Sequence, residues 1–151
     1  MVSTHVDDFD VAGSKKFVEM LTKEISTVLD VSTVESDSFR FTVIDVKKVK
    51  GGIEISMEDY AKSLEEIQIR EAKADETLTR EELKIYRKFV GKFNWLAANT
   101  RPDLVIYALD LAKKQKKAVT KDLREVKRVL KKVREKESKV VFTKLERKNY
   151  V

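Results

Sequence analysis

The feature that most constrains the fold is a helical repeat of apolar residues in the second half of the chain, in three segments that each open on a capping pattern. Thr79-Arg80-Glu81-Glu82 is a capping box ahead of the first segment. Thr100-Arg101-Pro102-Asp103 supplies a cap residue, a proline in the first turn and an acid for the second. Thr120 caps the third, whose apolar side consists of Leu123, Val126, Leu130 and Val133. A three-helix unit is therefore expected.

The first half of the chain mixes strand and helix signals. Residues 2–13 favour two short strands and a tight turn, and Ser14 is the expected cap of an amphipathic helix over residues 14–29. Residues 39–47 alternate as a strand, and the glycine pair at 51–52 before a second alternating run predicts a β-hairpin. Ser56 begins another capping pattern, so a helix is expected from there to about residue 69.

These signals predict an α+β fold, in which a small antiparallel sheet with a packed helix precedes the three-helix unit. We place an α+β lobe at residues 1–69 and a linker at 70–78, where the apolar stripe is weak and the sign of the charge changes. A helical lobe follows at 79–143, including a short strand at 139–143, and a polar tail at 144–151. The two lobes either share a core or are joined only by the linker.

Composition excludes several kinds of site. The chain has no cysteine and one histidine, which leaves out disulfides, thiol catalysis and zinc sites built from Cys or His. No apolar stretch approaches the ~20 residues of a membrane span, and the N-terminus lacks the apolar core of a signal peptide. We therefore expect an intracellular protein, of the nucleus or cytoplasm, without a membrane partner.

The net charge of +6 conceals a strong asymmetry. Residues 1–75 carry 10 Lys and Arg against 16 Asp and Glu, whereas residues 76–151 carry 22 against 10. A basic second half favours a polyanionic partner, DNA or RNA, bound without sequence preference. The candidate phosphate-binding residues lie on and just before the third helix of the unit: Lys113, Lys114, Lys117, Lys121, Arg124, Lys127, Arg128, Lys131 and Lys132. The same charges would also serve as the solubilising surface of a helical protein.

Five blocks of the sequence follow the order and spacing of one protein family. His5-Val6-Asp7-Asp8-Phe9 with Val11-Ala12-Gly13-Ser14 after it resembles the Tyr-Val-Asp-Asp hairpin of reverse transcriptases of the Ty1/copia class of retrotransposons. Residues 52–60 resemble its "gI.IsQ..Y" segment and residues 86–97 its "YR.lVG.L.YLa" helix. Residues 100–103 match its "TRPD" block, and residues 126–133 resemble its "a.kr.LrYLkgT" helix. The resemblance runs from about residue 4 to residue 143.

The resemblance implies a palm-like lobe at 1–69 and a thumb-like lobe at 79–143, with an incomplete polymerase site. In that family, carboxylates from the hairpin and from an earlier strand hold two metal ions, and Asp7 and Asp8 supply only half of such a site. His5 also stands where the family has Tyr, and Val43 where it has Gly. We therefore expect no catalytic residue and no cofactor. Weak, vestigial Mg²⁺ binding at Asp7 and Asp8 is one interpretation of these acids, and a solvated acidic turn is the other.

Two functions remain open, besides an active polymerase whose missing metal strand would come from a partner chain. The first is a non-catalytic, nucleic-acid-binding remnant of a copia-like reverse transcriptase. The second is an interaction module that assembles, for instance as a homo-oligomer, through the exposed edge of its truncated sheet. Phe89, Phe93, Trp95 and Tyr107 could stack on bases, although their helical spacing favours core packing.

Overall fold

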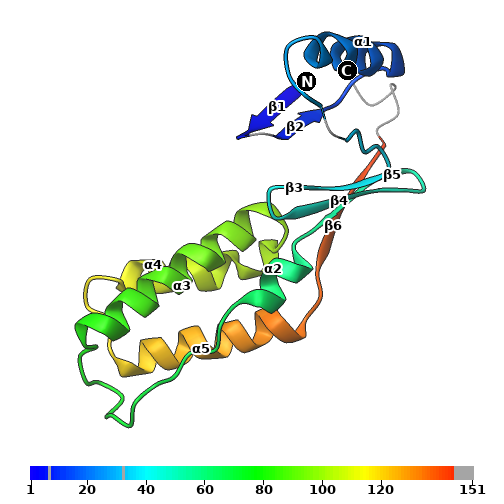
Figure 1. The fold of residues 1–151 in the computed structure, drawn as a ribbon. Helices are drawn as coiled ribbons and strands as arrows, with labels where there is room; N and C mark the ends of the chain where they lie inside the picture. Colours follow the sequence, from blue (N-terminus) through cyan, green and yellow to red (C-terminus); the bar gives the residue numbers. More distant parts are fainter. Residues whose placement is uncertain (7, 32, 145–151) are drawn as a thin grey trace.

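The hydrophobic core lies among the helices of the second half of the chain and the segment that leads into them. The computed structural model describes residues 1–6, 8–31 and 33–144. Within them the four helical elements of the bundle are α3 (Arg80–Asn99), the 3-10 turn η1 (Pro102–Leu104), α4 (Val105–Lys114) and α5 (Thr120–Glu135). Their facing sides supply most of the buried residues, and α2 (Glu58–Ser63) packs at one end (Figure 1).

A four-stranded antiparallel sheet joins the two halves of the chain. Its order is β3 (Ser38–Phe41), β4 (Ile44–Val49), β5 (Gly52–Ser56) and β6 (Lys139–Thr143), so a strand from the end of the chain completes a sheet begun near its start. Cross-strand partners share a face, and the register gives one face made almost entirely of apolar side chains. With these helices and sheets, the predicted α+β class is confirmed.

A separate two-stranded hairpin and one helix form the N-terminal unit. Strand β1 (Val2–His5) pairs with β2 (Asp8–Val11), and α1 (Lys15–Ser26) follows. The side chain of Ser14 caps α1 by accepting from the backbone N–H of Phe17 at 3.3 Å, as the sequence predicts. This unit lies beyond the sheet, at the opposite end from the helical bundle (Figure 1). None of the described residues before Met57 is fully buried.

Two predicted elements have different boundaries in the structure. The strand expected at residues 39–47 is two strands, β3 and β4, because the chain turns at Thr42, whose φ is +60°. Ser56 ends β5 and caps no helix, and α2 stops at Ser63 instead of continuing to about residue 69. Beyond it the chain is extended, and Leu64 and Ile67 still reach the core at 2% exposure each. These two side chains are therefore buried without a helix to place them.

The predicted linker, residues 70–78, is held against the start of α5. Glu76 accepts at its carbonyl from both the N–H (2.9 Å) and the hydroxyl (3.1 Å) of Thr120, and Thr77 forms a β-bridge with Val119. Thr120 is therefore not the N-cap of α5; that position belongs to Val119, whose N–H donates to Asp122. Since residues from both sides of this segment belong to one core, the shared-core arrangement is the one that the structure adopts.

Candidate nucleic-acid interface

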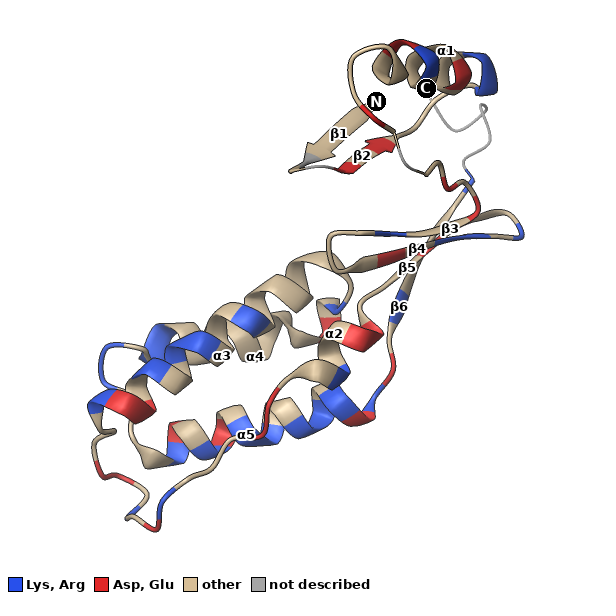
Figure 2. Ribbon diagram, viewed as in Figure 1, with Lys and Arg blue, Asp and Glu red and all other residues tan. Residues whose placement is uncertain are grey.

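Helix α5 places its apolar residues inward and its basic residues outward. Leu123, Val126, Leu130 and Val133, the predicted stripe, are each at most 2% exposed, and Val129 adds to it. Lys and Arg residues occur along the whole length of the helix, with the acids Asp122, Glu125 and Glu135 between them (Figure 2). Because one turn has 3.6 residues, the cations divide between two flanks, one facing the chain after α2 and one facing α4.

The first flank lines a groove of about 740 Å³ between α5 and residues 62–67. Its cationic lining consists of Lys62, Lys127, Arg128, Lys131 and Arg134. Two acids, Glu66 and Glu135, lie among them at 3.8 Å from Arg134 and Lys131 respectively, in exposed ion pairs. Exposed pairs of this length contribute little free energy, so an anion of higher charge density can replace the carboxylates.

Two of these cations were not among the predicted residues. Arg134 lies three residues after Lys131 and seven after Lys127, so the helical repeat already placed it on the same flank. Lys62 is brought there by the packing of α2 against α5, which no local sequence signal encodes.

The second flank is built around Tyr107 of α4. The Nζ of Lys132 lies 4.5 Å from the centre of the ring and donates to the Tyr107 hydroxyl at 3.2 Å. The guanidinium of Arg128 lies 5.9 Å from the same ring and bonds Glu125, which raises the pKa of Arg128 and lowers that of Glu125. These two predicted phosphate contacts are thus oriented by an aromatic ring and an acid before any ligand binds.

The other predicted residues differ in how they are held. Lys114 bonds Asp110 at 2.7 Å, which raises its pKa, and it also faces Asp122 at 3.6 Å. Arg124 donates to the carbonyl of Ala72 at 2.7 Å and so ties the 70–78 segment to α5. Lys113, Lys117 and Lys121 are exposed near the start of α5 and the turn before it. Of the predicted residues, Lys114 and Arg124 thus have structural partners, as Arg128 and Lys132 do.

Arg101, which opens the "RPD" turn, is almost completely buried, at 2% exposure. Its guanidinium binds both carboxylate oxygens of Asp103, at 2.9 and 3.0 Å, and donates to the carbonyls of Val133 (3.3 Å) and Lys136 (2.9 Å) at the end of α5. Helix C-termini leave carbonyls without intrahelical donors, and Arg101 satisfies two of them. The residue is a lock between η1 and α5, with no surface left to offer a phosphate.

The four aromatic residues considered for base stacking are divided by the structure. Phe89 and Phe93 are core residues, at 2% and 0% exposure. Trp95 is 46% exposed on the outer side of α3, contrary to the expectation that helical spacing buries it. Counted along the helix, it lies opposite the buried side, and the same outer side carries Lys84, Lys88 and Gly91.

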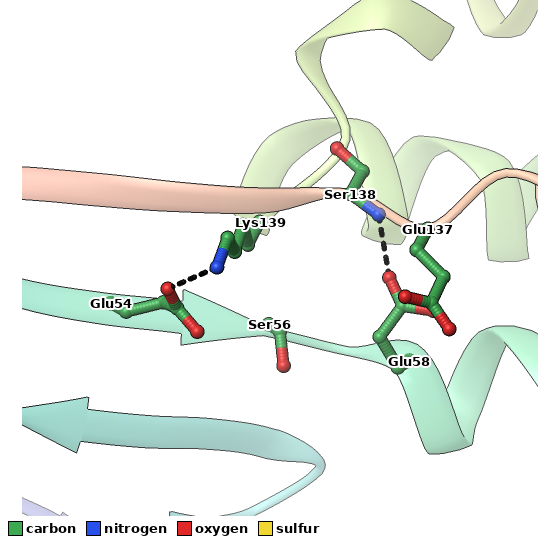
Figure 3. A pocket seen from close by; sticks show the side chains of 6 residues that line it. All are labelled: Glu54, Ser56, Glu58, Glu137, Ser138 and Lys139. Atoms are coloured by element: carbon green, nitrogen blue, oxygen red, sulfur yellow. Dashed lines mark hydrogen bonds and ion pairs between the residues drawn. The ribbon is translucent and has the colours of Figure 1, made fainter.

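The acidic residues that could be considered as metal ligands lie in two places, the N-terminal hairpin and a pocket beside the sheet. Asp7 lies outside the described residues, and Asp8 is exposed in β2. Glu54, Glu58 and Glu137 line a pocket of about 490 Å³ where β5, α2 and β6 meet (Figure 3). Glu54 bonds Lys139 at 2.7 Å, and Glu58 accepts the N–H of Ser138 at 2.6 Å (Figure 3). Within residues 1–6, 8–31 and 33–144, no group of three or more His, Asp or Glu side chains is arranged to hold a metal ion.

Comparison with known proteins adds no relative: no family model, curated protein or solved structure matches the chain. In the part of the chain that the structure describes, no helix has the length and apolar character needed to cross a lipid bilayer. The fold and the charged groove are thus the observations on which a function must rest.

Proposed function

We propose that the protein is a non-catalytic nucleic-acid-binding module that holds the phosphate backbone of DNA or RNA along α5. The observation that carries this proposal is the groove beside α5, whose lining holds five cations and two acids. Among the described residues, Lys127, Lys131 and Arg134 have no acid closer than 3.8 Å, whereas Lys62 pairs with Glu137 at 3.0 Å and Arg128 with Glu125 at 2.5 Å. A nucleic-acid backbone carries one negative charge per nucleotide. A row of cations along a helix can therefore contact several phosphates of one strand, whereas a small anion would contact only one or two of them.

The expected binding is electrostatic and without sequence preference. If about four phosphates are neutralised in the groove, log K falls against log salt with a slope of roughly −3 to −4, and Kd lies at about 10⁻⁴ to 10⁻⁶ M near physiological salt. No pair of side chains in the groove is suited to read the edges of adenine, since its lining contains neither Asn nor Gln. Single-stranded and duplex probes of different sequence should therefore bind with similar affinity within each form.

The test is a salt titration of fluorescence anisotropy with labelled single-stranded and duplex probes. The Lys127→Glu, Lys131→Glu, Arg134→Glu triple variant should lose at least ~10-fold in affinity and most of the salt slope. The matched control, Lys16→Glu, Lys23→Glu, Lys50→Glu, makes the same change in net charge at exposed lysines far from the groove. If the two triple variants lose equal affinity, overall charge and not the groove accounts for binding.

We further propose that the module descends from a copia-like reverse transcriptase and has no polymerase activity of its own. The support is the ordered series of sequence blocks, from the Asp7-Asp8 hairpin to the basic helix, together with the half metal site that the hairpin alone can supply. Purified protein should not extend a primer with Mg²⁺ or Mn²⁺. Template-dependent extension that disappears in the Asp7→Asn, Asp8→Asn variant would refute this part of the proposal.

A further inference from the structure

Strand β6 is an edge of the four-stranded sheet, and its pairing with β5 shows which of its backbone groups point away from the sheet. The N–H of Lys144 donates to the carbonyl of Gly51 at 2.8 Å, which fixes the phase of the ladder with β5. Hydrogen-bonded pairs alternate along antiparallel strands. Val140 and Phe142 therefore bond β5, whereas the N–H and C=O groups of Lys139, Val141 and Thr143 point away from the sheet.

The side chains of β6 do little to protect this edge. The run Val140-Val141-Phe142-Thr143 has no charge, and Val141 and Phe142 are 47% and 57% exposed. Ile53, the cross-strand partner of Phe142, is 48% exposed as well. Uncharged, apolar edge strands are templates for further strand pairing, and proteins usually block them with charge or a bulge.

The other edge of the same sheet is blocked in that way. Strand β3 carries Arg40, which binds Asp45 at 2.6 Å and Asp59 at 2.5 Å, so a fixed charged cluster lies on the strand. Its last residue is followed by Thr42 at a φ of +60°, which bends the chain out of the strand direction. Of the two edges, β6 is the one suited to accept a strand.

We propose that β6 pairs with β6 of a second copy of this chain, antiparallel and about a two-fold axis through Val141. In this register Val141 faces its own counterpart, and Lys139 faces Thr143 of the second copy. Lys139, Val141 and Thr143 are the residues whose backbone groups point outward, so all three pairs that they form are hydrogen-bonded pairs. Each such pair has two hydrogen bonds, and the ladder gains six.

The side chains select this register over its neighbours. It places Val140 opposite Phe142 of the second copy, an aromatic and β-branched pair of the kind that stabilises strand pairing. Because both residues lie on the apolar face with Ile53 and Ile55, that face continues across the two sheets. A shift by two residues in either direction would place Lys139 or Lys144 opposite a valine, and like charges are never opposed in the register proposed.

A second copy is the occupant that this edge fits best, because an isologous contact requires a patch that is complementary to itself. The contact is independent of the proposed nucleic-acid function, since β6 and the α5 groove share no residue. The interface is small, so association should be weak and should appear only at high protein concentration.

The test is the mass in solution of the full chain, measured by sedimentation velocity from about 10 µM to about 1 mM. We expect the mass to rise from the 17.5 kDa of one chain towards twice that value. Val141→Pro removes an outward N–H without breaking the β5 ladder, and Val141→Lys opposes two like charges at the axis. Both should remain at the mass of one chain, whereas the matched Val141→Thr variant should associate like the parent.

A crosslinking experiment tests the register itself, and the chain has no cysteine to interfere. A Val141→Cys variant places two thiols on a hydrogen-bonded pair, where Cα atoms ~5.5 Å apart permit a disulfide. In a Thr143→Cys variant the two thiols lie four residues apart along the strands, at ~13 Å, which is too far. Three results would overturn the proposal. The parent could stay at the mass of one chain at every concentration, the Val141→Lys variant could associate as strongly as the parent, or the two cysteine variants could crosslink equally.

Discussion

The first prediction concerns Arg101. Its position in the "TRPD" block could suggest a contact with a ligand, but in the structure its side chain joins η1 to the end of α5. Arg101→Ala removes two bonds to the Asp103 carboxylate and two to carbonyls at the end of α5. It leaves the carboxylate without its partner and two helix-end carbonyls without donors. Breaking a buried ion pair by removing one member typically costs about 3–5 kcal/mol, and because the Asp103 side chain is 29% exposed we expect the lower end of that range.

This cost is a large part of a total stability that for a domain is about 5–15 kcal/mol. It should lower Tm by roughly 10 °C. Arg101→Lys keeps the charge but loses the planar fork that reaches the carboxylate and the carbonyls together, so we expect a loss of about 2 kcal/mol or more. Urea unfolding followed by far-UV circular dichroism measures both variants, with the exposed Arg87→Ala on α3 as a control expected within about 0.5 kcal/mol.

The reasoning fails if Arg101→Ala costs less than about 1 kcal/mol. It fails equally if that variant keeps its stability and loses nucleic-acid affinity, because the residue would then contact the ligand. We expect the variant to lose both stability and affinity. An osmolyte that increases the folded fraction should then restore the affinity.

Three further predictions concern Asp103, Thr120 and the aromatic residues of α3. Arg101 lowers the pKa of Asp103 in the folded protein. The stability that this pair contributes is therefore complete above the unfolded pKa of about 3.9 and is lost as the pH falls through the lower folded pKa. In urea titrations at decreasing pH, the stability of the Asp103→Asn variant should fall less steeply than that of the parent. Thr120→Val should cost about 1 kcal/mol and speed tryptic cleavage in residues 70–78, because it removes the hydroxyl bond to Glu76; unchanged cleavage would show that this bond does not anchor the segment. Phe93→Ala should destabilise by about 3–5 kcal/mol and Trp95→Ala by about 1, and equal values in thermal unfolding would contradict their different burial.

Local sequence signals predicted those parts of the fold that local physics determines. The apolar side of α5 followed from its helical period, and the caps at Ser14 and Thr79 followed from side chains that bond their own helix. The period misled at residues 64–69, because Ala61, Leu64 and Ile67 recur every third residue, yet Leu64 and Ile67 are buried by the tertiary fold after α2 has ended.

The candidate site was predicted in outline and missed in detail for a related reason. Charge density and periodicity located the basic side of α5. The groove also needs Lys62, which comes from another element, and the ring of Tyr107 that orients Lys132 comes from α4. Arg101 is the extreme case, because its carbonyl partners lie 32 and 35 residues further along the chain.

The late position of β6 in the sequence has a consequence for synthesis on the ribosome. The contact of Glu58 with Ser138 joins residues 80 positions apart, and β5, already paired with β4, gains its second neighbour only when β6 has left the exit tunnel. Helices α3 to α5 rest mainly on short-range contacts and can form earlier, since local contacts are made faster than distant ones. During that interval β5 is itself an open edge, so slow translation or loss of the final residues would expose an Ile-rich strand to other nascent chains.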